Sequence, residues 1–256
     1  MRDLNGYILR LDNALKEKLF FVDKINLYEY DLIIDFGCAT GTLLNEISLI
    51  AKHAGVKLVG YDCSEDMLTR AKTLHPHLLF TSSFDQLIMW MLHACKPLVI
   101  FSSVLHEIPV SNDNAWKDIY EVMQRAHTVV VRDMKRPSNN EPISNITRKR
   151  VLSQVAPWQA EMFESKWGKI VDKENLYRFF LMNEFVDNFE TEVEEDYFNV
   201  PWSEIAWKLE ATHNTLYERS YVLPYRKAQV KKRFNHVLND ITHREIILQK
   251  KKNIQK

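Results

Sequence analysis

Between residues 31 and 132, short apolar runs alternate with segments that have the periodicity of amphipathic helices. The runs that we expect to be strands are 31–36, 56–61, 77–81, 97–102 and 127–132. The segments that we expect to be helices are 41–54, 64–74, 84–94 and 114–126. Strands and helices that alternate in this way form a parallel sheet with helices on both faces, and right-handed crossovers make the sheet doubly wound. The sequence therefore predicts an α/β, Rossmann-like fold.

The chain on either side of this alternation is expected to add further elements. Residues 7–28 have the spacing of an amphipathic helix that precedes the first strand. Residues 147–210 are mostly helical in pattern and rich in aromatic side chains. Residues 215–225 and 241–249 are typical of two further strands, with a basic helix between them. We therefore predict seven strands in total and a helical insertion before the last two.

Charge and cysteine content exclude several classes of protein. The 34 basic and 34 acidic residues leave a net charge near zero, so a basic field over the whole chain is excluded, although a local patch is not. Three cysteines without a CxxC pair encode neither a disulfide scaffold nor a zinc ribbon, and we expect no metal site. The sequence has no signal-peptide pattern and no run of 18 apolar residues. We therefore expect a cytoplasmic protein that does not enter a membrane.

The junction between the first strand and the following helix carries the most informative motif, Asp35-Phe-Gly37-Cys-Ala39-Thr-Gly41. Ligands of open parallel sheets bind beyond the carboxyl ends of the strands. Two glycines and an alanine keep side chains away, so that a ligand can approach the backbone. Asp62 ends the second strand, where a carboxylate can accept hydrogen bonds from both hydroxyls of a ribose.

The spacing of the motif separates two kinds of cofactor. A dinucleotide site needs the pattern GxGxxG, but position 42 is threonine and the third glycine is absent. The negative charge of Asp35 would also repel a pyrophosphate, whereas it suits a sulfonium ligand that carries an ammonium group. A nicotinamide oxidoreductase is therefore disfavoured.

With these residues in place, the sequence resembles class I S-adenosylmethionine (SAM)-dependent methyltransferases. The resemblance rests on residues 35–41, 60–72 and 97–107, and it covers roughly residues 31–136, about two fifths of the chain. Ala39 departs from the usual middle glycine of the family. The resemblance implies a mostly parallel seven-stranded sheet that ends in an antiparallel C-terminal hairpin. It implies SAM as the cofactor, held by Asp35, Gly37, Cys38, Ala39, Gly41, Asp62, Cys63, Met67, Ser83, Phe84 and Ser102.

Several of these residues have a second interpretation. Cys38 and Cys63 flank the cofactor loop and are typical of small packing residues. Met67 can lie against the adenine or in the core. After the third strand, the family often has an acid near the adenine, but this chain has Ser83 and Phe84 there. We place the adenine contact at those two residues.

Residues after the fourth and fifth strands are candidates for acceptor chemistry. His106 can remove a proton from an O–H or N–H acceptor, because the pKa of a free imidazole lies near neutrality. The alternative is that His106 only opens a helix. Ser103, Glu107 and Arg132 are candidate substrate contacts, and Arg132 can instead form an ion pair with its neighbour or with acids of the insertion.

We expect methyl transfer to an O or N nucleophile of a small-molecule or nucleotide-like acceptor. The segment Phe101 to Val104 lacks the motifs of amino-group and cytosine-C5 methylases of nucleic acids. RNA is the alternative acceptor, through the basic helix with Arg226, Lys227, Lys231, Lys232 and Arg233. A SAM-binding module without turnover is a third possibility. The expected divisions are a SAM-binding core at 1–136, a cap over the substrate site at 137–214, and the last two strands with a basic tail at 215–256.

Overall fold

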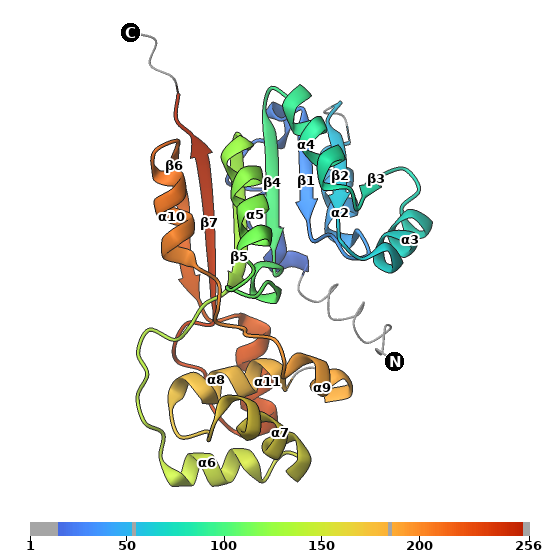
Figure 1. Ribbon diagram of the computed structural model, residues 1–256. Helices are drawn as coiled ribbons and strands as arrows, with labels where there is room; N and C mark the ends of the chain where they lie inside the picture. The colour runs from blue at the N-terminus through green and yellow to red at the C-terminus, as the bar shows by residue number, and fades with distance from the viewer. Residues whose placement is uncertain (1–14, 53–54, 184–185, 253–256) are drawn as a thin grey trace. The chain divides into compact units, whose positions relative to one another are not determined.

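The computed structural model describes residues 15–52, 55–183 and 186–252. Seven strands form one sheet in the order β3-β2-β1-β4-β5-β7-β6, shown as arrows in Figure 1. The strands are β1 (Leu32–Phe36), β2 (Lys57–Tyr61), β3 (Leu79–Thr81), β4 (Pro97–Ser102), β5 (Thr128–Met134), β6 (His213–Tyr221) and β7 (His243–Lys250). The first five pair in parallel, as the sequence predicts.

Burial explains why these strands are apolar runs. Every residue of β1, β4 and β5 is buried, because parallel strands in the middle of a sheet have helices on both faces. The register aligns Asp35 with Gly60 on one side and with Ile100 on the other. The polar residues at the carboxyl ends of β1, β2 and β4 therefore share one edge of the sheet.

The last two strands run antiparallel to their neighbours, which backbone hydrogen bonds at both ends of β7 show. The bonds that join β7 to β5 are Lys135 N to Thr242 O and Lys250 N to His127 O. The bonds that join β7 to β6 are Thr242 N to Tyr221 O and Lys251 N to Thr212 O. A helix, α11 (Pro224–Phe234), separates the two strands along the chain, so they are antiparallel neighbours without a tight hairpin turn. The order and direction of the strands confirm the Rossmann-like methyltransferase fold.

Helices of the sheet unit cover both faces. Helix α2 (Thr42–Ile50) and the segment from residue 15 to η1 (Leu27–Glu29) pack on one face, in a core that includes Ile33, Ile100 and Val130. Helices α4 (Phe84–His93), α5 (Asp113–Arg125) and α10 (Trp202–Glu210) lie in front of the sheet in Figure 1. The unit also contains α3 (Glu65–Leu74) and the short turn η2 (Leu105–Glu107).

The helix expected over residues 7–28 is wrong in its second half. Residues 7–14 lie outside the described residues, and within the described part of this segment only residues 15–18 are α-helical. Turns and η1 follow, and Phe21, Ile25 and Leu27 are all buried. Ile25 and Leu27 would point to nearly opposite sides of one α-helix, so a continuous helix could not bury both. Tertiary packing therefore overrides the helical pattern.

A second compact unit consists of residues 134–200 together with residues 219–244. Its helices are α6 (Asn145–Leu152), α7 (Pro157–Trp167), α8 (Lys173–Met182), α9 (Phe189–Glu192) and α11, with the turn η3 (Val186–Asn188). Its core is aromatic and includes Phe163, Phe179 and Phe234. The division differs from the expected insertion at 137–214, since α10 groups with the sheet and α11 with this helical unit. No described helix has the length and apolar character needed to cross a membrane.

Candidate active site

The loop that follows β1 has an unusual backbone conformation. Gly37, Ala39 and Gly41 have φ angles of 76°, 46° and 77°, in the left-handed region that favours glycine. The N–H groups of Gly37 and Cys38 both donate to the carbonyl of Tyr61, at the end of β2. The loop therefore turns sharply over the edge of the sheet and leads directly into the N-terminus of α2, where backbone N–H groups are available to a ligand.

Asp62 holds this loop through its carboxylate. Oδ2 accepts a hydrogen bond from Ala39 N at 2.8 Å, and Oδ1 accepts one from Ser64 N at 2.9 Å. Ser64 in turn caps α3 by accepting a hydrogen bond from Met67 N. Each carboxylate oxygen can accept a second hydrogen bond, so this geometry is compatible with binding a ribose diol.

Close packing surrounds the glycines at this edge, including Gly41, where a Cβ atom would lie 2.8 Å from the ring of Phe80. A Cβ atom at Gly37 would lie 2.3 Å from Cγ2 of Val104, just after β4. A Cβ atom at Gly60 would lie 2.6 Å from the ring of Phe80 and 2.7 Å from Cys38 Sγ. The ends of β1, β2 and β4 thus approach one another too closely for larger residues.

Two buried polar residues, Asp35 and Ser102, lie at the ends of the central strands. Asp35 is 3% exposed, and no described residue donates a hydrogen bond to its carboxylate. Burial raises the pKa of Asp35 to about 7, although the nearby Lys18 ammonium lowers it and Asp62 raises it further. The hydroxyl of Ser102 is also buried without a hydrogen-bond partner among the described residues. A buried hydroxyl without a described partner and a buried carboxyl group beside it fit a ligand that brings polar atoms of its own.

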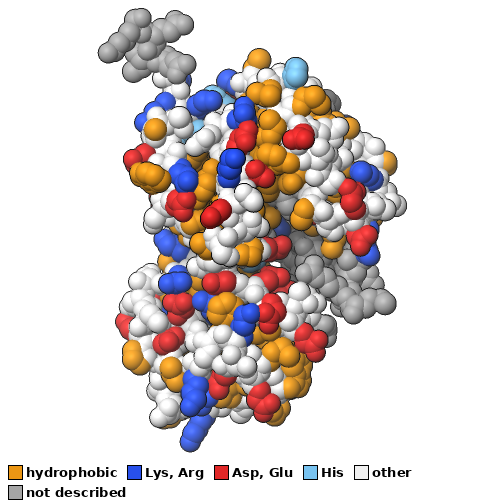
Figure 2. Space-filling view, viewed as in Figure 1, with side chains coloured by type: hydrophobic (Ala, Val, Ile, Leu, Met, Phe, Trp, Pro, Cys, Tyr) orange, Lys and Arg blue, Asp and Glu red, His pale blue; other side chains and the backbone are white. Residues whose placement is uncertain are grey.

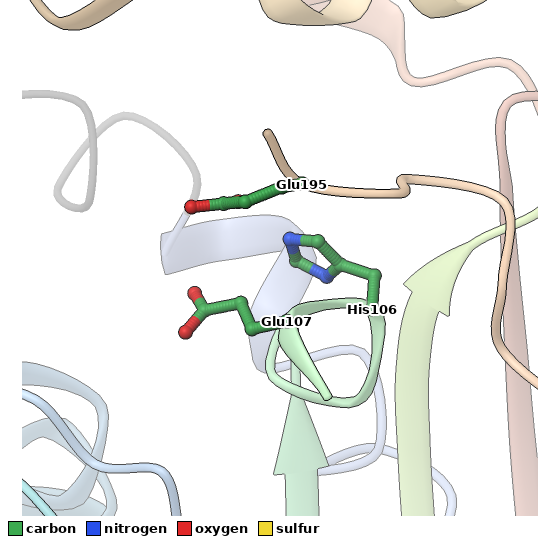
Figure 3. Close-up of side chains that lie close together, drawn as sticks. All are labelled: His106, Glu107 and Glu195. Atoms are coloured by element: carbon green, nitrogen blue, oxygen red, sulfur yellow. The ribbon is translucent and has the colours of Figure 1, made fainter. Parts of the chain in front are cut away.

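His106 and Asp133 form a buried pair. Nδ1 of His106 lies 2.7 Å from Oδ1 of Asp133, and the two side chains are 5% and 0% exposed. Oδ2 of the same carboxylate accepts hydrogen bonds from the backbone N–H groups of Val104 and Leu105. Figure 3 shows His106 beside Glu107 on the turn η2 that follows β4. Asp133 therefore fixes both the imidazole and the backbone that carries it.

Arg132 and Ser103 link the ends of β4 and β5. The guanidinium of Arg132 is 2% exposed, and its NH1 group donates to Ser103 Oγ at 2.8 Å. Ser103 N donates to the carbonyl of Arg132, and Ser103 has a left-handed φ of 59°. The two residues thus form a rigid connection at the predicted acceptor end of the sheet.

The other predicted cofactor residues have varied surroundings. Cys38 is buried against Gly60, and burial raises the pKa of its thiol far above the usual range, as for a packing residue. The hydroxyl of Ser83 caps α4 by accepting a hydrogen bond from Gln86 N. The ring of Phe84 meets the ring of Tyr61 edge-on, with 6.3 Å between the ring centroids. Met67 is half-buried, whereas Cys63 and Glu107 are exposed. Contact of these side chains with a cofactor or substrate stays a prediction.

The structure weakens the argument for RNA contact by α11. Arg226 is 3% exposed and donates to the carbonyl of Leu181, and Arg233 donates to the carbonyl of Asn183 at 2.6 Å. Both arginines thus serve the helical unit itself, which leaves Lys227, Lys231 and Lys232 exposed. On the face drawn in Figure 2, basic and acidic side chains are interspersed.

Sequence reasoning missed two residues of this region. Asp133 was considered only as a neighbour of Arg132, and Lys18 was not singled out at all. An acid at the end of a buried strand is a signal for Asp133, because it must meet a partner when the strand is covered. Lys18 gives no such signal, since its spacing is that of an ordinary helix.

No protein-family model and no curated protein matches this sequence. Among solved structures, the PH0226 protein of Pyrococcus horikoshii OT3 is 12% identical, with a TM-score of 0.48 over 98% of this chain and 94% of that one. The plantazolicin methyltransferase BpumL, solved with a monoazolic desmethylPZN analogue and S-adenosylhomocysteine (SAH), is 11% identical, with a TM-score of 0.49 over 97% of this chain and 86% of that one. The methyltransferase domain of bacterial CtHen1-C is 13% identical, with a TM-score of 0.44 over 95% of this chain and 98% of that one. At these identities the likeness concerns the fold alone, and the assignment of the fold rests on the strand order and register of this chain.

Proposed function

We propose that this protein is a SAM-dependent methyltransferase that acts on an O or N nucleophile of a small-molecule or nucleotide-like acceptor. The observation that carries the proposal is the Asp62 carboxylate, which holds the left-handed loop at Ala39 beside the start of α2. A loop of this shape supports the proposal because its backbone could approach a nucleoside, and the Asp62 carboxylate could accept hydrogen bonds from a ribose.

The residues at this edge match the parts of SAM in their chemistry. Asp62 would accept hydrogen bonds from the ribose hydroxyls, and Asp35 would accept one from the ammonium of the methionine part. Phe84 and Met67 would lie against the adenine. Bound SAM supplies a methyl group on a sulfonium, so a neutral thioether leaves when the acceptor attacks. The protein then contributes mainly proximity and orientation.

His106 is the residue best placed to remove the acceptor's proton. When Nδ1–H donates to Asp133, the lone pair of the ring lies on Nε2, which is the atom that would accept the proton. The negative charge of Asp133 would stabilise the imidazolium that forms. Asp133 also holds the turn η2 through two backbone N–H groups, so the base would keep its orientation during the reaction.

Calorimetric titration with SAH, with NAD as the control ligand, tests the cofactor assignment. We expect SAH to bind and NAD not to bind. Binding of neither would remove the basis of the proposal. Methyl transfer from labelled SAM to a broad set of acceptors then separates an enzyme from a binding module, since only the enzyme releases SAH at a rate that depends on His106.

A further inference from the structure

Helices α5 and α10 lie side by side on one face of the sheet, and both belong to the sheet unit. An open hollow of about 660 Å³ is lined by residues of both helices. Its charged lining residues form what we call the α5–α10 face: Asp113, Lys117, Glu121, Arg125, Glu204 and Lys208. Three of them are acidic and three are basic, so the face is densely charged but neutral as a whole.

The charges on α5 alternate in sign along the helix. From Asp113 to Arg125 they are four residues apart, in the order acid, base, acid, base. Residues with this spacing form one ridge of a helix, and such ridges fit into the grooves of a neighbouring helix. The buried residues of α5, among them Ile119 and Met123, lie on the opposite side. The ridge therefore faces away from the core and is accessible to a partner.

This ridge is complementary to itself when its direction is reversed. A two-fold axis through its midpoint would place Asp113 opposite Arg125 of a second copy of the chain. The same axis would place Lys117 opposite Glu121 of the second copy. Each pair would occur twice, because two-fold symmetry repeats every contact. A parallel arrangement in the same register would bring like charges together, so the alternation favours an antiparallel contact.

Helix α10 fits the same axis. Lys208 Nζ lies 4.4 Å from the centroid of the Tyr120 ring, and Tyr120 is one residue from the midpoint of the ridge. The axis would therefore also pass close to Glu204 and Lys208, whose charged atoms are 3.3 Å apart. Reversal exchanges this acid with this base. Each could thus pair with its opposite on the second copy, as the charges of α5 do.

The ion pairs within one copy would be cheap to exchange. Glu121 with Arg125 and Glu204 with Lys208 are pairs of residues four apart, and their side chains are between 33% and 48% exposed. Exposed pairs of this kind contribute little to stability. The outer side of α10 also carries an apolar anchor, since Trp207 is 66% exposed and tryptophan is enriched at the centres of interfaces.

We propose that the α5–α10 face binds a second copy of this chain in an antiparallel, two-fold symmetric arrangement. The charge pattern carries this choice of partner, because all six charged residues meet an opposite charge when the face meets itself. The interface is independent of the proposed function, since neither helix contributes a residue to the predicted cofactor site.

Sedimentation of the full chain provides the first test. We expect the wild type to form a species of twice the 30.3 kDa of the chain, and to dissociate as the salt concentration rises. Lys117→Glu and Glu121→Lys should each weaken the dimer by at least about tenfold, because each variant places like charges opposite one another twice. Lys72→Glu is the matched control, because Lys72 is exposed on α3, outside this face, and it should leave the dimer unchanged.

A mixture of the two variants tests the arrangement itself. Lys117→Glu and Glu121→Lys should associate with each other far more tightly than either does with itself, because every contact between them again joins opposite charges. The double variant with both changes should dimerise for the same reason. Recovery in the mixture would also show that each variant is folded, so that loss of the dimer is not due to misfolding.

Three results would overturn the inference. The wild type could stay monomeric up to roughly 0.1 mM, in which case a different partner uses the face or none does. The two single variants could dimerise as well as the wild type, which would place the dimer contact on another surface. Their mixture could fail to associate although each variant is folded by circular dichroism, which would exclude the antiparallel pairing of α5.

Discussion

Nδ1 of His106 and Oδ1 of Asp133 lie 2.7 Å apart, although 27 positions separate the two residues along the chain. The contact exists because β4 and β5 pair in register, with Ser102 opposite Arg132. The residues that follow these strands therefore meet at one edge. A buried histidine held in this way has a defined tautomer, which is what a general base requires.

Asp133→Asn should greatly reduce methyl transfer without affecting SAH binding. A carboxamide cannot accept hydrogen bonds from both the imidazole and the Val104 and Leu105 N–H groups, because one of its two ends is a donor. We expect a loss of about a hundredfold or more in kcat, in the range of general-base catalysis. The free energy of unfolding should fall by about 1–3 kcal/mol for the broken buried network.

Steady-state kinetics with any acceptor that the wild type methylates check this expectation. The double variant His106→Ala with Asp133→Asn should be no slower than the slower single variant, because the two residues act as one unit. If the two losses multiply instead, Asp133 does not act through His106.

Asp62→Ala should weaken SAH binding by at least about tenfold, because it removes the acceptor for the ribose and releases the loop at Ala39. Thermal unfolding should show a stability loss of about 1–2 kcal/mol from the two lost backbone hydrogen bonds. Asp66→Ala is a suitable control, since Asp66 is exposed on the first turn of the same helix. Equal SAH affinities for wild type and Asp62→Ala would show that the cofactor site lies elsewhere.

Gly37→Ala and Gly55→Ala should differ strongly, although both glycines have a left-handed φ. At Gly55, no atom lies within 4 Å of a new Cβ, so alanine costs only the backbone strain of about 1 kcal/mol. At Gly37, the new Cβ would lie 2.3 Å from Val104, and overpacking adds about 1–3 kcal/mol. Urea unfolding of both variants measures the difference, and equal losses would argue against the close approach of β1 and β4.

Asp35→Asn should stabilise the protein, and the gain should grow as the pH rises. The pKa of Asp35 is about 7 in the folded protein against an ordinary value of 3.8, so the folded state keeps a proton that the unfolded chain releases. The free energy of unfolding of the wild type therefore falls as the pH rises from about 3.8 to about 7. The asparagine variant has no carboxyl group at this position and lacks this loss. Lys18 does not add to the pH dependence of stability in this range, because its pKa in the folded protein is about 8 and it stays protonated.

Urea unfolding at about pH 4.5 and about pH 7.5 tests the pH dependence, with an expected extra gain of at least about 1 kcal/mol at the higher pH. A gain that is independent of pH would mean that Asp35 is ionised throughout. The same variant should bind SAH more weakly, as expected when a site keeps an unfavourable buried charge for its ligand.

The parallel part of the sheet could be predicted because buried strands leave a direct trace in the sequence. Ile33, Ile34 and Val130 have no exposed side on which a polar residue would be tolerated. The N-terminal segment was harder, because the spacing of Phe21 and Ile25 suits a helix while the burial of Leu27 does not. The sequence does not show whether the helical spacing of Phe21 and Ile25 or the burial of Leu27 decides the local structure.

The cofactor loop could also be predicted, since its glycines and Asp62 are neighbours of strand ends along the chain. The pair of His106 and Asp133 depends instead on the register of two strands, which periodicity does not determine. Lys18 lies farther still from any motif. Its environment follows only from the way the segment before η1 packs on the sheet.

The strand order has a consequence for synthesis on the ribosome. The five strands that pair in parallel, β1 to β5, end at Met134, about halfway along the chain, so their sheet can assemble while the remainder is still being translated. Until His243 and the residues after it emerge, β5 is an open edge, whose Val129, Val130 and Val131 pair with β4 on one side and with no strand on the other. Such an edge pairs readily with other chains. The nascent protein is thus most exposed to aggregation, and most dependent on chaperones, while its helical unit is being made.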